Sequence, residues 1–202
     1  MKKLLSLVFL LYFSSAHSQT WQPVGGGFDF AVFTLAADTV NNVLYAGGQF
    51  DTADGNACSR VAQWNGANWD TIGTGLSNGY VKDLAMFNNQ LYACGSFTNA
   101  GNKIRKFFTR WNGTSWDSIG FTIANCNPQK MIVYNNELYI GGGFPTAGGI
   151  TVNKITRFNG TQFDSASSGT NNVVHAMAVY NNELYIGGAF DSVAGMPANH
   201  VA

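Results

Sequence analysis

The sequence has few of the residues from which enzyme sites and binding patches for polyanions are built. Of its 202 residues, 11 are basic, 11 are acidic, three are histidine and three are cysteine. The one concentration of positive charge lies at 103–110, and we interpret it as a solvated loop and strand edge. Nucleic acids and anionic membrane surfaces require a basic patch, so the composition argues against both as partners.

Cysteine and histidine are too scarce for a disulfide framework or a metal cluster. The three cysteines, Cys58, Cys94 and Cys126, allow at most one internal disulfide, and we favour free thiols over a Cys58–Cys126 bridge. Residues 51–56 resemble a calcium loop that lacks its later acidic ligand, which favours an ordinary turn. No phosphate loop, serine nucleophile elbow or cysteine–histidine signature is present. The sequence therefore identifies no catalytic, cofactor-binding or metal-binding residue, and we lean towards a protein that is not an enzyme.

What the sequence does contain begins with a predicted signal peptide over residues 1–18. Lys2 and Lys3 precede an apolar run from Leu4 to Phe13, and Ala16-x-Ser18 has the small residues of a cleavage site. The run is too short to span a bilayer. We therefore predict a secreted or cell-surface protein with no membrane span, whose mature chain keeps 11 acidic and 9 of the 11 basic residues.

The mature chain repeats one unit four times. The segment LYAGGQF from Leu44 returns as LYACGSF from Leu91, LYIGGGF from Leu138 and LYIGGAF from Leu184, at spacings of 47, 47 and 46 residues. Leu, Tyr and Phe favour a pleated strand, and apolar residues on both faces predict an inner strand that is buried on both sides. The paired glycines predict that a neighbouring unit approaches too closely there for a side chain.

Each unit reads as four antiparallel strands without helical periodicity. An apolar strand, such as 81–87, is followed by a turn at Asn88-Asn89 and then by the glycine-containing strand. A loop with an Ala-Gly pair leads to the third strand, and an Asn-Gly hairpin signal leads to the fourth. The third strand ends at Trp64, Trp111 or Phe158, and the fourth starts at Trp69, Trp116 or Phe163.

Four antiparallel strands in every unit predict an all-β fold, a β-propeller of four-stranded blades, with a β-sandwich as the weaker alternative. The Gly-Gly strand, followed about twenty residues later by Trp, resembles the kelch and galactose-oxidase type of blade. LYAGGQF, SRVAQWNG and WDTIG are similar to the repeats of secreted bacterial propellers with type IX sorting tails and of the fungal cell-polarity cortical marker family. The resemblance covers 21–202 and implies a secreted propeller, but no particular activity, because most members of these families lack an assigned one.

The repeat divides the chain into a signal peptide, a closing strand and four blades. Trp21–Gly25 aligns with the fourth strand at Trp69–Gly73, so we expect it to complete the last blade. Residues 199–202 match the start of a third strand, and we interpret the chain as a fragment that stops inside its last blade. The predicted boundaries are 1–18 for the signal peptide, 19–26 for the closing strand, and 27–73, 74–120, 121–166 and 167–202 for the blades.

Residues that recur in register are explained by packing and need no ligand. The predicted core comprises Tyr45, Tyr92, Tyr139 and Tyr185, Phe50, Phe97, Phe144 and Phe190, and the first-strand residues Leu35, Leu84, Met131 and Met177. A recurring aspartate on the fourth strand, at Asp70, Asp117 and Asp164, is expected to make a local hydrogen bond and not to act as an acid or base.

A ligand site is expected where the units differ. The two residues before each first-strand core residue vary completely, and they lie near the start of the strand that borders the central channel of a propeller. One aromatic side chain among several hydrogen-bonding groups suits a carbohydrate or a peptide ligand. The candidate residues are Phe33, Thr34, Lys82, Asp83, Gln129, Lys130 and His175. The alternative is a channel mouth that is merely solvated.

Three functions are compatible with these patterns. We favour an extracellular ligand-binding or adhesion module that uses no cofactor. The first alternative is a structural repeat region of a larger surface protein. The second is a fragment of a propeller enzyme, an oxidase or a glycan-active enzyme, whose site lies on blades outside this sequence.

Overall fold

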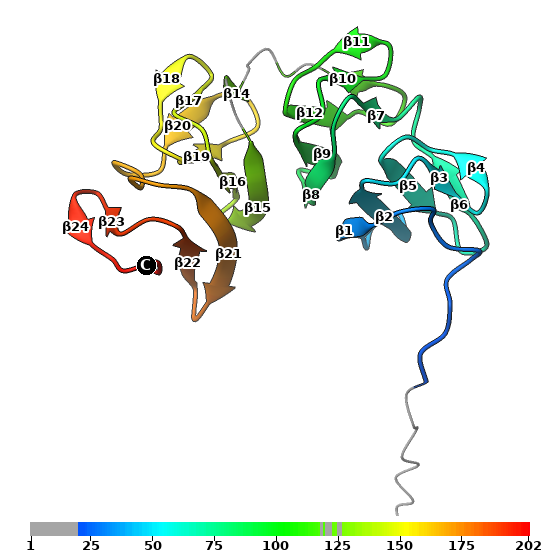
Figure 1. The fold of residues 1–202 in the computed structure, drawn as a ribbon, viewed down its shortest axis with the longest axis horizontal. Coiled ribbons are helices and arrows are strands. Elements are labelled where there is room, and N and C mark those ends of the chain that lie inside the picture. Colours follow the sequence, from blue (N-terminus) through cyan, green and yellow to red (C-terminus); the bar gives the residue numbers. More distant parts are fainter. Residues whose placement is uncertain (1–19, 118, 120–122, 125–126) are drawn as a thin grey trace, which may run out of the picture.

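The structure is a computed structural model that describes residues 20–117, 119, 123–124 and 127–202 (Figure 1). The predicted signal peptide and Cys126 lie outside the described residues. Within the described part of the chain every regular element is a strand, and every strand pairing is antiparallel. The predicted all-β class is therefore confirmed.

Each of the first three repeats forms a four-stranded sheet whose strands lie side by side in chain order. We call these sheets main sheets 1, 2 and 3. They consist of β1 (Val32–Asp38), β2 (Val43–Gly48), β5 (Val61–Trp64) and β6 (Trp69–Thr71); β8 (Val81–Phe87), β9 (Gln90–Gly95), β12 (Phe108–Trp111) and β13 (Trp116–Asp117); and β15 (Pro128–Tyr134), β16 (Glu137–Gly142), β19 (Ile155–Phe158) and β20 (Phe163–Ser165). Main sheet 4 consists of β21 (Val174–Tyr180) and β22 (Glu183–Gly188), and Val201 bridges to Gly187 where a third strand would pair.

Small hairpins occupy the connections between the second and third strands, where the sequence predicted loops. The Ala-Gly pairs lie in the turns of three of these hairpins, which lie towards the periphery of the molecule in Figure 1. The short strands are β3 (Thr52–Ala53) with β4 (Asn56–Ala57); β10 (Asn99–Ala100) with β11 (Lys103–Ile104) and β7 (Leu76–Ser77); β17 (Thr146–Ala147) with β18 (Ile150–Thr151) and β14 (Ile123–Ala124); and β23 (Ser192–Val193) with β24 (Met196–Pro197). β7 and β14 come from the segment that joins one main sheet to the next, so these small sheets tie neighbouring repeats together.

Two kinds of turn close the hairpins of the main sheets. The Asn88-Asn89 turn has φ values of 49° and 57°, the left-handed conformation of a two-residue type I′ turn, which matches the strand twist. The hairpin between the third and fourth strands, where the sequence has Asn-Gly, closes with a different turn. Trp64 pairs with Trp69 across a four-residue loop, in which Gly66 has positive φ and Asn65 does not. The side-chain oxygen of Asn65 instead accepts hydrogen bonds from the next backbone amides, at Ala67 and Asn68.

The core lies between consecutive main sheets. The first strands β1, β8, β15 and β21 contact one another in that order, and Figure 1 shows them towards the middle of the molecule. Leu84, Met131 and Met177 are buried as predicted, and each belongs to an apolar cluster that joins its sheet to a neighbouring one. The prediction for Leu35 is wrong: its side chain is 59% exposed, because no described sheet precedes main sheet 1.

The paired glycines meet two different neighbours. A Cβ atom on Gly47 would lie 2.6 Å from a methyl group of Val81 in main sheet 2, so this glycine is required by the neighbouring repeat, as predicted. A Cβ atom on Gly48 would instead collide with the carbonyl oxygen of Ala31, just before β1 of the same sheet. The second glycine therefore accommodates the start of the first strand in its own repeat and not a neighbouring unit.

The recurring phenylalanines and aspartates take the structural roles that repetition predicted. Phe50, Phe97, Phe144 and Phe190 are all 0% exposed, and burial of each contributes about 2 kcal/mol. Among the recurring tyrosines, Tyr45 and Tyr92 are buried as predicted, but the prediction for Tyr185 is wrong: it is 38% exposed, because no described sheet follows main sheet 4. The recurring aspartates accept local hydrogen bonds, as between Asn65 and Asp70, Asn112 and Asp117, and Arg157 and Asp164.

Candidate functional site

Each of the four first strands contains a β-bulge at the same place, a feature that the sequence patterns do not reveal. The register to the second strand shifts between Val32 and Thr34, and the same shift recurs in β8, β15 and β21. The extra residue in each bulge is Phe33, Lys82, Gln129 or His175. These four are the first members of the variable pairs, so a position that differs in all four repeats coincides with a backbone irregularity that redirects a side chain.

Two of the bulge residues come together in an exposed group of rings and a cation. The Lys82 ammonium lies 4.9 Å from the ring centroid of Phe33 and 5.9 Å from that of Tyr80. The rings of Phe33 and Tyr80 meet edge to face at 6.4 Å, and they are 43% and 37% exposed. We call Phe33, Tyr80 and Lys82 the aromatic–cation cluster, which offers apolar ring surface beside hydrogen-bond donors.

Sequence reasoning missed Tyr80 and its neighbour Arg60. The Arg60 guanidinium lies 6.0 Å from the Tyr80 ring centroid and donates hydrogen bonds to the carbonyl oxygens of Gly79 and Gln49. Arg60 Nη1 also lies 2.7 Å from a carboxylate oxygen of Asp51. Tyr80 immediately precedes β8, at the position that Ala31 occupies before β1. That difference between repeats is the signal that could have identified Tyr80.

The second members of the first three variable pairs form a largely buried network that joins three main sheets, whereas Ala176, the second member of the fourth pair, is exposed. The Thr34 hydroxyl donates to Asp83 Oδ1 at 2.7 Å, and the Lys130 ammonium donates to the same oxygen at 3.0 Å. Asp83 Oδ2 accepts the backbone N–H of Met131 at 2.7 Å. Thr34 is 8% exposed and Asp83 is 1% exposed, so their polar atoms stabilise the fold. Of these three residues only Lys130 is substantially exposed, at 41% of its side chain.

The remaining two candidates, Gln129 and His175, lie in the bulges of the neighbouring strands β15 and β21. Gln129 is half-buried and His175 is exposed. Within the described part of the chain neither side chain hydrogen-bonds to the protein, so both are free to bind a ligand. The accessible part of the candidate site is therefore the aromatic–cation cluster together with Lys130, Gln129 and His175.

The other polar groups that the sequence singled out are bound to backbone. Residues 51–56, the weak calcium-loop candidate, include β3 and the turn that leads to β4, with positive φ at Asp54 and Gly55 in that turn. The Asp54 carboxylate accepts the N–H groups of Gly26 and Trp69. Among the described residues, no group of three or more His, Cys, Asp or Glu side chains is placed to hold a metal ion.

The two cysteines within the described ranges are free thiols in apolar surroundings. Cys58 is 2% exposed and Cys94 is 0% exposed. Burial raises the pKa of the Cys58 thiol to about 12, with a further contribution from the negative charges of Asp29 and Asp51. Burial likewise raises the pKa of Cys94 well above its usual value. Neither thiol has the low pKa that a nucleophilic cysteine requires.

No protein-family model matches the chain, and no curated protein is significantly similar to it. In residues 20–117, 119, 123–124 and 127–202, the structure has no helix long and apolar enough to cross a membrane. The all-β class and the geometry of the bulges are therefore the basis for any functional conclusion.

Proposed function

We propose that the four main sheets are blades of a β-propeller of the kelch-like kind. This proposal is supported by the spacing of the repeats, by the four-stranded order of main sheets 1 to 3 and by the sequential contacts of their first strands. In a propeller the innermost strands surround a central channel. The four bulges then lie around one mouth of that channel.

We further propose that the protein is a non-catalytic ligand-binding or adhesion module. The observation that carries this proposal is that four unlike side chains, at Phe33, Lys82, Gln129 and His175, are presented by four identical bulges. A scaffold that repeats for packing reasons gains an asymmetric site only where its repeats differ. Binding residues commonly lie at such positions, at the ends of elements held by a rigid framework.

A carbohydrate or a peptide is the ligand class that these groups suit best. The exposed rings of Phe33 and Tyr80 provide flat apolar surface for the apolar face of a sugar ring or for an aliphatic side chain. Lys82 provides a hydrogen-bond donor beside that surface, and Gln129 and His175 provide further hydrogen-bonding groups at the equivalent bulges of β15 and β21. The formal charge of the chain is zero over its whole length, so no polyanion is proposed.

The proposed ligand site is tested by glycan-array and peptide-array binding of the exported protein. The variants Phe33→Ala, Lys82→Ala, Gln129→Ala and His175→Ala are compared with two matched exposed controls, Lys103→Ala and His200→Ala. We expect at least two of the bulge variants to weaken binding about tenfold, or about 1.4 kcal/mol, while both controls remain within twofold. If all four bulge variants bind as the wild type does, the ligand site lies elsewhere.

Export of the protein is the companion proposal, supported by the charged start, apolar run and cleavage motif of residues 1–18. N-terminal sequencing of protein recovered from the medium or the cell surface tests it. Material that starts at Gln19 is expected, whereas material that retains Met1 would contradict cleavage.

A further inference from the structure

A small, mainly polar cleft of about 190 Å³ lies between main sheets 1 and 2. Each of these sheets has all four of its strands, so the cleft does not depend on where the chain begins or ends. The cleft lies beside the last residue of β1, at the opposite end of that strand from the bulge. The lining residues used below are Asp38, Asn41 and Tyr45 of main sheet 1 and Asn89, Gln90 and Trp111 of main sheet 2.

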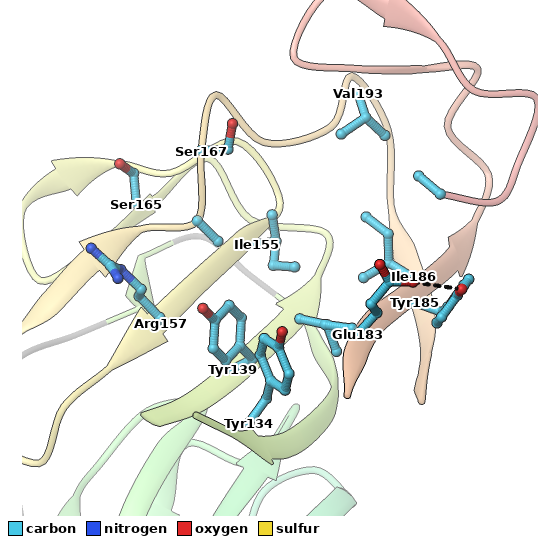
Figure 2. Close-up of a pocket in the computed structure, with 13 residues that line it drawn as sticks. Tyr134, Tyr139, Ile155, Arg157, Ser165, Ser167, Glu183, Tyr185, Ile186 and Val193 are labelled. Atoms are coloured by element: carbon cyan, nitrogen blue, oxygen red, sulfur yellow. Dashed lines mark hydrogen bonds between the residues drawn. The ribbon is translucent and has the colours of Figure 1, made fainter. Parts of the chain in front are cut away.

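The cleft exists because Asp38 stands where the other repeats have an aromatic ring. The last residue of the first strand is Asp38, Phe87, Tyr134 or Tyr180 in the four repeats. The ring of Phe87 packs on the tyrosine of its own second strand, Tyr92, with centroids 5.8 Å apart. The rings of Tyr134 and Tyr139 pack in the same way at 5.7 Å, and Figure 2, a close-up beside main sheet 3, shows them next to each other. Tyr45 has only a carboxylate at this place.

The following repeat does not close the space that the missing ring leaves. Between main sheets 2 and 3, a Cβ atom on Gly160 would lie 3.1 Å from the side-chain nitrogen of Asn88 and 3.9 Å from the ring of Phe87. Gly113 is the corresponding glycine of the second repeat, and a Cβ atom there would have no other atom within 4 Å. The loop that reaches a ring in one interface therefore borders an opening in the other.

The first repeat also lacks the arginine that accompanies this tyrosine elsewhere. Arg110 pairs with Tyr92 across the sheet, whereas Gln63 pairs with Tyr45. Burial raises the pKa of the Tyr92 hydroxyl, and Arg110 offsets part of that rise. Burial also raises the pKa of the Tyr45 hydroxyl, and the negative charge of Asp38 adds to the rise. The first repeat has thus replaced a ring and a cation by a carboxylate and an amide.

A longer turn brings a further amide to the cleft. The first and second strands are joined by the four residues 39–42 in main sheet 1 but by two residues, such as 88–89, in the other main sheets. The side-chain amide of Asn41, in this longer turn, donates to Asp38 Oδ2 at 2.8 Å, and the backbone N–H groups of Val40 and Asn41 donate to Oδ1. A carboxylate has about four acceptor positions, so one remains open on Asp38.

Several polar groups of the cleft have no partner within the described part of the chain. Tyr45 is 8% exposed, yet its hydroxyl makes no hydrogen bond there. The side-chain amides of Asn89 and Gln90 are likewise without a partner among the described residues. A buried hydroxyl that lacks a partner costs free energy, which a hydrogen-bonding ligand would recover. The cleft therefore offers one fixed acceptor, one hydroxyl, and amides that can both donate and accept.

We propose that this cleft binds a single neutral sugar residue. The hydroxyl groups of a sugar both donate and accept, so they match a carboxylate, a phenol and amides in one small space. Trp111 supplies ring surface for the apolar face of the sugar. The volume is below the roughly 300 Å³ at which drug-sized ligands begin to fit, so the cleft takes one sugar ring and not a chain. A cationic side chain would pair with Asp38 but would leave the amide N–H groups of Asn89 and Gln90 without acceptors. This inference does not depend on the ligand site proposed at the bulges.

Saturation-transfer NMR of the whole protein tests the proposal with the methyl glycosides of glucose, galactose and mannose as probes. At least one of them is expected to bind saturably with a dissociation constant of about 1 mM, the strength typical of so small a ligand. Tyr45→Phe, which removes only the hydroxyl, and Gln90→Ala are each expected to weaken binding about threefold. Gln162→Ala removes an exposed amide from main sheet 3 and is the matched control, with unchanged binding.

Asp38→Phe restores the ring that the second repeat has at this place. It is expected to fill the cleft and to weaken binding at least about tenfold. Because this variant also removes the hydrogen bonds of the turn, its folding is checked by thermal unfolding. Tyr45→Phe and Gln90→Ala decide the question if Asp38→Phe does not fold.

Three results would overturn the proposal. The first is that none of the three glycosides binds saturably up to about 50 mM. The second is a glycoside that binds Tyr45→Phe, Gln90→Ala and folded Asp38→Phe as tightly as the wild type, which would place the sugar elsewhere, for example at the bulges. The third is tighter binding of n-butylammonium than of any glycoside, lost in Asp38→Asn, which would assign the cleft to a cationic side chain.

Discussion

The hydroxyl of Thr34 donates a 2.7 Å hydrogen bond to the carboxylate of Asp83, which lies 49 residues further along the chain in the next main sheet. The same carboxylate accepts the Lys130 ammonium and the backbone N–H of Met131 from main sheet 3. One buried side chain thus joins the first strands of three repeats. Buried charges are stabilising only when they are fully hydrogen-bonded, and this carboxylate meets that condition.

Replacing Asp83 by alanine is expected to destabilise the protein by about 3 kcal/mol, because Thr34, Lys130 and the Met131 amide all lose their acceptor. Thr34→Val is expected to cost about 1.5 kcal/mol, and the double variant less than the sum. Urea unfolding measures these values. Asp70→Asn, on an exposed outer strand, is the control and is expected to stay within about 0.5 kcal/mol. An Asp83→Ala variant as stable as this control would contradict the structural role.

The two glycines of main sheet 4 are expected to respond differently to a methyl group. A Cβ atom on Gly188 would collide with the carbonyl oxygen of Val173, so Gly188→Ala is expected to cost about 3 kcal/mol by displacing the backbone at the bulge. A Cβ atom on Gly187 would come no closer than 3.8 Å to another atom, so Gly187→Ala is the matched control. Thermal unfolding of both variants checks the difference. Equal melting temperatures would show that the start of β21 is free to move.

Asp38 is expected to contribute stability that is lost in acid. Its carboxylate accepts the side-chain amide of Asn41 and the backbone amides of Asn41 and Val40, and these hydrogen bonds, that of the Asn41 side chain foremost, lower its pKa. A lowered pKa contributes stability that is fully present above the unfolded pKa of 3.8 and disappears as the pH falls through the folded pKa.

The expected result is a melting temperature difference between wild type and Asp38→Asn that is constant near neutral pH and shrinks below pH 3.8. Thr39→Ala, at the exposed neighbouring position, serves as the control, with a difference that does not change with pH. If the difference for Asp38→Asn grew in acid, the hydrogen bonds of this carboxylate would not be lowering its pKa.

The buried cysteines are expected to be unreactive in the folded protein. In a Cys126→Ser background, Cys58 and Cys94 are expected to react with a disulfide reagent at pH 8 at least about 100-fold more slowly than in denaturant, because the raised pKa and the burial both suppress thiolate attack. Two thiols should be counted after unfolding. Rapid stoichiometric reaction of the native protein would show that the sheets open readily.

Much of this fold could be predicted because its strands and turns follow from local sequence patterns that recur in every repeat. Alternating apolar strands, the Asn-Asn turns and the ends of the third and fourth strands follow from residue types and spacing alone. The small peripheral hairpins were missed because two-residue strands have no periodicity to detect. The prediction for the Asn-Gly loop was wrong about Asn65. The sequence predicted positive φ at this residue, whereas its side chain stabilises the loop by accepting a hydrogen bond from a backbone amide.

The sequence by itself determined the repeat, the all-β class and the variable positions at which a site is sought. Only the tertiary structure decided that the first two variable pairs split in two, with Phe33 and Lys82 in accessible bulges while Thr34 and Asp83 are buried. It also decided that Leu35 is exposed, although Leu84 at the same place in the next repeat is buried. The physical reason is that burial and hydrogen bonding depend on which sheet packs against a residue, and neighbouring sheets bring together residues about 47 positions apart, beyond the reach of local sequence patterns.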